Sequence, residues 1–241
     1  MANNIPVVIF AVLGVLCVPL AGWILDRMPA KCFCDYDETP DERHQPPRMG
    51  RKQKILCAVI LAAVFAILTL RFGVGVKSIA LCLFSAAMVM TAVSDVKYCI
   101  IPDELIIAGC VFAVASAMPH IMTAQGFVNK LSPVFGAAIG AGIILGINLL
   151  GRLLYKKDAL GMGDLKLMVV CGIACGAGGT LMALAVGILA AAGFFAVGMA
   201  LKRIRQGDYL PLGPFLVFGT LFILCFRPLV DHLLAWYISL I

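Results

Sequence analysis

The sequence predicts an all-α fold, a polytopic bundle of about eight transmembrane helices. Of its 241 residues, 62% are hydrophobic and only 13% are charged, whereas a soluble domain is about half apolar and a quarter charged. Several apolar runs approach the roughly 20 residues that a helix needs to cross a bilayer. The one long polar segment is too short to form a second domain. We therefore expect residues 1–241 to form one membrane-embedded domain with a short loop at 26–54.

The first apolar segment, residues 5–25, is predicted to be a transmembrane helix. It resembles a secretory signal peptide only superficially, because no Lys or Arg precedes it. The residues that follow, Asp26-Arg27-Met28-Pro29, do not form the small-residue site at which a signal peptide is cut.

The middle of the chain is predicted to hold four further transmembrane helices. They cover residues 55–70, 78–94, 104–118 and 131–151. Pro102 suits the first turn of the helix at residues 104–118, because the N–H that proline lacks is not needed there. The fifth helix, residues 131–151, is expected to approach a neighbour closely at Gly136, Gly140 and Gly146.

The last part of the chain is predicted to add three helices. A sixth is expected to begin at Asp164 and to fade at residues 176–179, where three of the four residues are glycine. A seventh covers residues 180–201, and a basic loop leads from it into an eighth. Pro228 is expected to kink or stop the eighth helix, which leaves residues 233–241 as a tail at the membrane interface.

Lys and Arg are spread unevenly over the two sides of this topology. The loops after the first, third, fifth and seventh helices share one side. The other side holds only Arg71, Lys77, Lys130 and Arg227, so 15 of the 19 basic residues remain for the first. Basic residues mark the cytoplasmic side of an inner or plasma membrane. This bias accounts for the net charge of +6, and we expect no nucleic-acid partner.

Two aspartates at the predicted cytoplasmic helix ends are the candidate catalytic residues. Asp164 follows Gly161 and Gly163, which permit unusual backbone angles, and Asp95 ends the third predicted helix. A charge near a transmembrane segment is costly and usually serves a function. Two neighbouring carboxyl groups share a proton, so one can take a proton from water while the other donates one to a carbonyl oxygen. This is the chemistry of peptide hydrolysis without a metal or a covalent intermediate.

Two other interpretations of these aspartates are open. Each could be a helix cap, since Asp is common at helix N-termini. Alternatively, the pair could form a proton or cation relay in a small transporter, which predicts carboxylates near the bilayer midplane and internal repeats. The sequence instead places both aspartates at helix ends, and its halves do not resemble each other.

The ten cysteines predict neither a disulfide framework nor a metal site. Most lie in apolar runs, where cysteine behaves as a small hydrophobic residue. Cys32 and Cys34 form the only closely spaced pair in a polar loop, and one intervening residue is poor spacing for zinc. We expect reduced thiols and no bound metal.

The motifs taken together resemble those of the type IV prepilin peptidase (leader peptidase) family, within the GxGD intramembrane aspartyl proteases. The matching segments, in chain order, are Gly22 to Pro29, Asp95 with Ile101-Pro102-Asp103, Gly161-Met162-Gly163-Asp164-Leu165-Lys166-Leu167, and Pro211-Leu212-Gly213-Pro214-Phe215-Leu216. The resemblance therefore extends over most of the chain.

This resemblance implies a membrane aspartic endopeptidase of the type IV pilus and type II secretion pathways. Such enzymes remove the short basic leader of a prepilin or pseudopilin at the cytoplasmic membrane face. Asp95 and Asp164 match the catalytic pair, and Gly161, Gly163 and Asp103 match positions expected to bind or approach substrate. The implied partners are the prepilin and the lipid bilayer, and the oligomeric state stays open.

One departure from the family concerns the loop at residues 26–54. Many bacterial members carry a larger insert there, with two Cys-x-x-Cys pairs, and also methylate the new N-terminus with S-adenosylmethionine. The short loop here argues against methyl transfer, and the peptidase reaction needs no cofactor. We also expect the loop's acidic residues, Asp35, Asp37, Glu38, Asp41 and Glu42, to face a basic leader. The two catalytic aspartates are expected to close together only when substrate binds.

Overall fold

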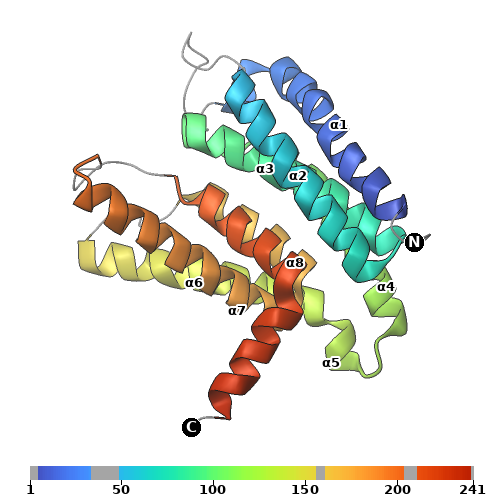
Figure 1. Ribbon diagram of the computed structural model, residues 1–241. Helices are drawn as coiled ribbons and strands as arrows, with labels where there is room; N and C mark the ends of the chain where they lie inside the picture. The colour runs from blue at the N-terminus through green and yellow to red at the C-terminus, as the bar shows by residue number, and fades with distance from the viewer. Residues whose placement is uncertain (1–4, 34–48, 156–160, 204–210, 240–241) are drawn as a thin grey trace.

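The computed structural model describes residues 5–33, 49–155, 161–203 and 211–239, and helices dominate all four ranges (Figure 1). In chain order they are α1 (Ile5–Arg27), the 3-10 turn η2 (Ala30–Phe33), α2 (Arg51–Phe72), α3 (Val76–Tyr98), α4 (Asp103–Thr123), α5 (Phe127–Lys130), α6 (Ser132–Tyr155), α7 (Met162–Ala200) and α8 (Gly213–Ile238). No strand occurs within these ranges. The all-α prediction is confirmed.

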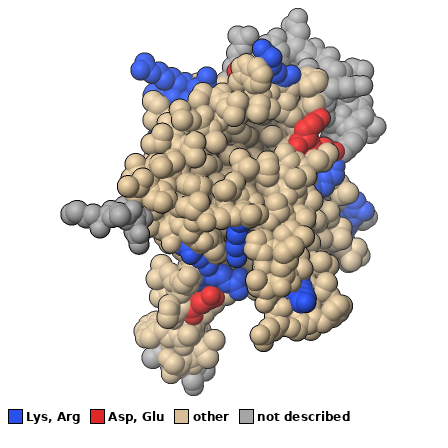
Figure 2. Space-filling model, turned by 90° about the vertical axis from the view of Figure 1, so that its right-hand side faces the viewer, with Lys and Arg blue, Asp and Glu red and all other residues tan. Residues whose placement is uncertain are grey.

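Seven of these helices are long and apolar enough to cross a membrane. Their outward surfaces are also apolar: Val12, Leu16 and Trp23 of α1 are each about half exposed. A helix that is hydrophobic on every side is typical of a membrane span. Figure 2 shows a broad uncharged area on one face of the bundle, with charged side chains above and below it. The chain is therefore a multi-pass membrane protein.

The helices form two groups that meet at α3 and α4. α1, α2 and α3 lie side by side in one group, and α6, α7 and α8 form the other (Figure 1). α3 packs on α8, and α4 packs on α7. The candidate site lies where the ends of these four helices meet.

The element α7 doubles back on itself at Gly176. Its contacts with α8 pair Cys171 with Thr220, Cys175 with Arg227, Ala183 with Gly219, and Gly187 with Phe215. Before Gly176, later residues of α7 contact later residues of α8. After Gly176, later residues of α7 contact earlier residues of α8, so the two arms of α7 run in opposite directions. The two arms are separate helices that meet at Gly176, and they correspond to the sixth and seventh predicted helices.

The reversal depends on a backbone conformation that favours glycine. Gly176 has φ 69° and ψ 174°, and L-residues with a side chain rarely adopt such a positive φ. Two side chains satisfy backbone groups that the break leaves without helical partners. Ser132 accepts the Ala177 N–H at 3.3 Å, and the Arg227 guanidinium donates to the Cys175 carbonyl at 3.2 Å.

α8 kinks at Phe226, two residues before Pro228, as predicted. Proline has no N–H, so the carbonyl of Leu224, four residues earlier, loses its helical partner. The Arg71 guanidinium of α2 donates to this carbonyl and to that of Ile223. An arginine of a different helix thus satisfies the broken segment of α8.

Glycines allow the closest helix crossings in the bundle. A Cβ placed on Gly136 of α6 would overlap the backbone of Gly172 in α7, and one on Gly140 would overlap that of Met168. This agrees with the close approach predicted for Gly136 and Gly140. The prediction for Gly146 is wrong, because a Cβ there would have no neighbour within 4 Å. Gly146 lies on a face of α6 that points away from α7.

Candidate active site

Asp95 lies in the last turn of α3, where the chain turns towards α4. The helix ends at Cys99, which has a left-handed backbone with φ 53°, and its N–H bonds to the Asp95 carbonyl at 2.8 Å. The Ser94 hydroxyl donates to the Ile100 carbonyl at 3.0 Å and holds the following turn against the helix end. Asp95 is only 5% exposed, so its carboxylate depends on protein partners.

The N-terminus of α8 provides one such partner. The Gly213 N–H donates to Asp95 Oδ2 at 2.9 Å, and amides at helix N-termini are free to bind a carboxylate. A Cβ on Gly213 would lie 3.1 Å from Asp95 Cγ and closer still to Oδ2. Only glycine therefore allows this approach. Gly213 belongs to the Pro211-Leu212-Gly213-Pro214-Phe215-Leu216 motif, but no individual role could be predicted for it from the sequence.

Asp164 lies in the first turn of α7, three residues after the helix cap Gly161. Its carboxylate accepts a hydrogen bond from the Gly161 N–H, the contact that the third residue of a helix makes in a capping box. The predicted turn, with an aspartate at the start of a helix, is confirmed. Residues 156–160, which precede it, lie outside the described residues.

Gly163 brings the two aspartate-bearing segments together. A Cβ on Gly163 would lie 3.1 Å from the side chain of Ile101, which belongs to the turn after Asp95. The start of α7 thus packs directly on the end of α3. Asp95 and Asp164 are close enough for their charges to interact, as the shared-site prediction requires.

Asp103 forms an ion pair between α4 and α7. The Lys166 ammonium donates to Asp103 Oδ1 at 2.7 Å and to Oδ2 at 2.9 Å. Lys166 lies two residues after Asp164, so the pair holds the first turn of α7 against the first turn of α4. The predicted contact of Asp103 with substrate stays a prediction.

The segment after α1 also reaches this edge of the bundle. The Phe33 ring is fully buried and lies 5.4 Å from the Tyr98 ring at the end of α3. The Cys32 thiol donates to Glu104 Oε1 at 3.0 Å. Among the residues that the structure describes, no three His, Cys, Asp or Glu side chains cluster as metal ligands. Cys34 and the loop acids, residues 35–42, lie outside them.

The arrangement is therefore two carboxylates at one end of a membrane bundle, each bonded to a backbone amide of a helix N-terminus or its cap. Residues 82–197, which contain both aspartates, match the family model described as "Type IV leader peptidase family". The match covers 116 of the 241 residues, a little under half of the chain. The resemblance inferred from the motifs is confirmed.

Two curated relatives agree with this match. A "Prepilin leader peptidase/N-methyltransferase" of Xanthomonas campestris pv. campestris is 24% identical over 199 residues, 83% of this chain and 63% of that protein. A protein of the same name from Bacillus subtilis is 21% identical over 183 residues, 76% of this chain and 68% of that protein. The chain thus spans less than two thirds of the Xanthomonas relative. No solved structure matches the chain significantly.

The structure gives the transporter alternative no support. Asp95 and Asp164 lie in the terminal turns of α3 and α7, whereas a relay predicts carboxylates near the bilayer midplane. The helix-cap interpretation holds for Asp164 in part, since it does bond to the Gly161 N–H. It does not explain Asp95, which is buried at the C-terminal end of its helix.

Proposed function

We propose that this chain is an aspartic endopeptidase that removes the basic leader of type IV prepilins or pseudopilins at the cytoplasmic face of the membrane. The observation that carries the proposal is the placement of Asp95 and Asp164, 69 positions apart in the sequence, within electrostatic range at one end of the bundle. The match to the leader peptidase family model supports the same reaction, and both relatives are named as prepilin leader peptidases.

The two aspartates divide the acid and base roles. One carboxylate takes a proton from water as the water oxygen attacks the peptide carbonyl carbon. The protonated partner donates to the carbonyl oxygen, which gives a tetrahedral diol. In the collapse, the aspartate that took the water proton donates it to the amine nitrogen, and the other aspartate takes a proton from a diol hydroxyl as the C–N bond breaks. The pair thereby returns to its starting protonation. The Gly213 and Gly161 amides hold the carboxylates in place for these transfers.

The charge distribution supports a cytoplasmic site. Five basic residues lie at or near the helix ends on the same side of the bundle as Asp95: Arg27, Arg51, Lys97, Lys166 and Lys202. Basic side chains gather on the cytoplasmic side of a membrane protein. A leader that is itself basic stays on that side, so the bond to be cut is presented there.

The test is cleavage of a co-expressed prepilin in cells that lack their own prepilin peptidase. Asp95→Asn and Asp164→Asn should each remove almost all processing, because a proton-sharing pair needs both members. Asp231→Asn is the matched control: Asp231 pairs with Arg227 at the far end of α8, and its loss should leave processing intact.

Mass spectrometry of the mature pilin completes the test. It gives the cleavage position and shows whether a methyl group was added to the new N-terminus, the second activity in the relatives' names. Near-normal processing by either Asp→Asn variant would contradict the aspartic mechanism.

A further inference from the structure

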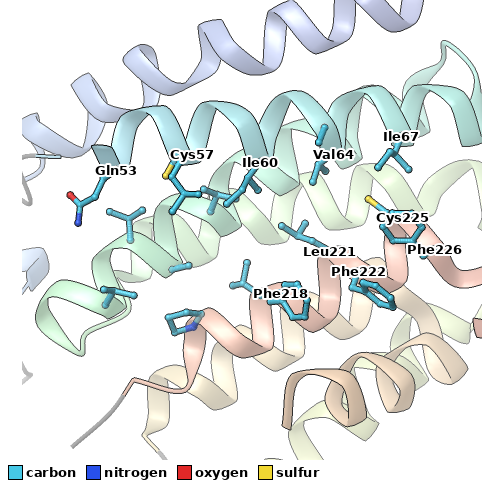
Figure 3. Close-up of a pocket in the computed structure, with 18 residues that line it drawn as sticks. Gln53, Cys57, Ile60, Val64, Ile67, Phe218, Leu221, Phe222, Cys225 and Phe226 are labelled. Carbon is cyan, nitrogen blue, oxygen red and sulfur yellow. The ribbon is translucent and has the colours of Figure 1, made fainter. Parts of the chain in front are cut away.

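A long apolar cleft runs between α2 and α8, with α3 as its floor (Figure 3). Its volume is about 600 Å³, and 18 residues line it. We call it the α2–α8 cleft. Gln53, at one end of the cleft, carries the only amide side chain among its lining residues; the rest are hydrocarbon, aromatic or thiol.

The cleft is an open groove and not a closed void. Its inner residues are buried: Val89 of the α3 floor is 6% exposed and Val217 of the α8 wall is 3% exposed. Its rim residues face outward, with Leu56 60% and Phe218 51% exposed. An elongated apolar group could therefore enter it sideways, from within the bilayer.

The dimensions of the cleft suit one face of a helix. Its α2 wall runs from Gln53 to Ile67, which is about 21 Å at 1.5 Å per residue. This is about two thirds of the roughly 30 Å hydrocarbon core. A helix of that length and about 10 Å in diameter would occupy about 1,600 Å³, so the cleft, at about 600 Å³, would enclose a little over a third of it. The rest of the helix would remain in contact with lipid.

One end of the cleft reaches the candidate active site. Val96 and Pro214 line that end, and each directly follows one partner of the Asp95–Gly213 hydrogen bond. Along α3, Ala92, Val93 and Val96 form the floor, and Asp95 lies three residues after Ala92 on the neighbouring row of the helix surface. A helix lying on this floor would therefore end beside Asp95.

The other end of the cleft is closed by a bridge. The Arg71 guanidinium of α2 donates to the Ile223 and Leu224 carbonyls of α8 and joins the two walls there. The cleft is thus a wedge that is closed at the far end and open at the end near the aspartates. A lipid chain does not need its end to lie at a fixed position in the cleft. A substrate helix does, because its end must reach a catalytic group.

We propose that the α2–α8 cleft binds the apolar helix that follows the leader of the prepilin and so positions the cleaved bond beside Asp95 and Asp164. This inference rests on the proposed function, because it assumes a substrate with an apolar helix. Small residues at the contact, Ala63 and Ala92, would allow close helix packing, which drives association within lipid where the hydrophobic effect does not.

The test compares two exposed alanines of apolar helices. Ala63→Trp fills the cleft wall, and Ala192→Trp places the same ring on an exposed position of α7 outside the cleft. Each variant is assayed on a full prepilin and on a short peptide that carries the leader and the cleaved bond without the apolar helix. The cleavage rate on the full prepilin, divided by the rate on the short peptide, should fall about tenfold for Ala63→Trp. For Ala192→Trp this ratio should stay at the wild-type value. Equal ratios in the two variants would overturn the proposal.

Photo-crosslinking gives a readout that depends on binding and not on turnover. A benzophenone amino acid at Phe218, on the cleft rim, should crosslink to the apolar segment of the prepilin, whereas the same probe at Ala192 should not. Crosslinks from Phe218 to lipid alone would reject the cleft as the substrate site. Failure of the wild-type protein to cut either substrate would instead reject the proposed function, and the crosslinks would still decide whether the cleft binds a prepilin helix.

Discussion

The carboxylate of Asp95 and the backbone N–H of Gly213 form a 2.9 Å hydrogen bond between residues 118 positions apart in the sequence. This bond joins the last turn of α3 to the first turn of α8. It directs one carboxylate oxygen to the helix N-terminus, where the positive end of the helix dipole stabilises it. It also fixes the end of the α2–α8 cleft, because Pro214 and Val96 line the cleft on either side of it.

The first prediction concerns Gly213→Ala. The added methyl group would overlap Asp95, so the carboxylate or the start of α8 must move. We expect activity to fall at least tenfold, together with a loss of about 1–3 kcal/mol of stability, the usual cost of overpacking. Gly193→Ala is the control, since a Cβ at Gly193 in α7 has no neighbour within 4 Å. Processing by Gly213→Ala at the level of Gly193→Ala would show that the contact has no role in catalysis.

The second prediction concerns the ion pair between Asp103 and Lys166. Both side chains are partly exposed, at 46% and 34%, so the pair should contribute no more than about 1 kcal/mol to stability. Its effect on catalysis should be larger, because Lys166 lies on the same helical turn as Asp164. We expect Lys166→Met to lower kcat several-fold with little change in unfolding temperature.

The charge-reversed double variant, Asp103→Lys with Lys166→Asp, separates positioning from direct contact with substrate. If the pair only holds α7 against α4, the double variant should recover most of the lost kcat. If Asp103 binds substrate, as the family resemblance implies, the double variant should stay impaired and show a raised KM.

Much of this architecture could be predicted from the sequence because it depends on local composition. The apolar runs predicted the helices. The glycine-rich residues 176–179 predicted the break in α7, because a positive φ is a local preference of glycine, as at Gly176. The distribution of Lys and Arg placed Asp95 and Asp164 on the same side, and the structure brings them together at one edge.

The parts that the sequence could not provide are contacts between distant segments. Nothing local to Gly213 indicates that Asp95 will occupy the space of its missing side chain. Arg71 looked like a residue at a turn, yet it satisfies two carbonyls of α8. Gly146 has the same local pattern as Gly136, and only the rotation of α6 against α7 decides which of them meets a neighbour.

The third prediction follows from that rotation. Gly172→Ala would place a methyl group against the backbone of Gly136 and force α6 and α7 apart. We expect a loss of about 1–3 kcal/mol of stability, measured as a lower unfolding temperature in detergent. Gly146→Ala should be neutral or slightly stabilising, because alanine favours a helix over glycine by up to about 1 kcal/mol where space allows. Equal effects of the two substitutions would mean that the α6–α7 crossing is not set by these glycines.

The fourth prediction concerns Arg71 and the proline kink of α8. Removing the guanidinium by Arg71→Met leaves the Leu224 carbonyl without a donor, since Pro228 has no N–H to offer it. A hydrogen bond to a charged group is worth about 1.5–3 kcal/mol, so the unfolding temperature should fall clearly. In a Pro228→Ala background the residue at 228 regains an N–H that can bond to Leu224.

A double-mutant cycle with these two substitutions isolates the carbonyl contact. Arg71→Met should cost markedly less in the Pro228→Ala background than in the wild-type chain, because the helix then satisfies its own carbonyl. If the two costs are equal, Arg71 stabilises the bundle by some route other than the broken segment of α8. In that case the closed end of the α2–α8 cleft must depend on other contacts between α2 and α8.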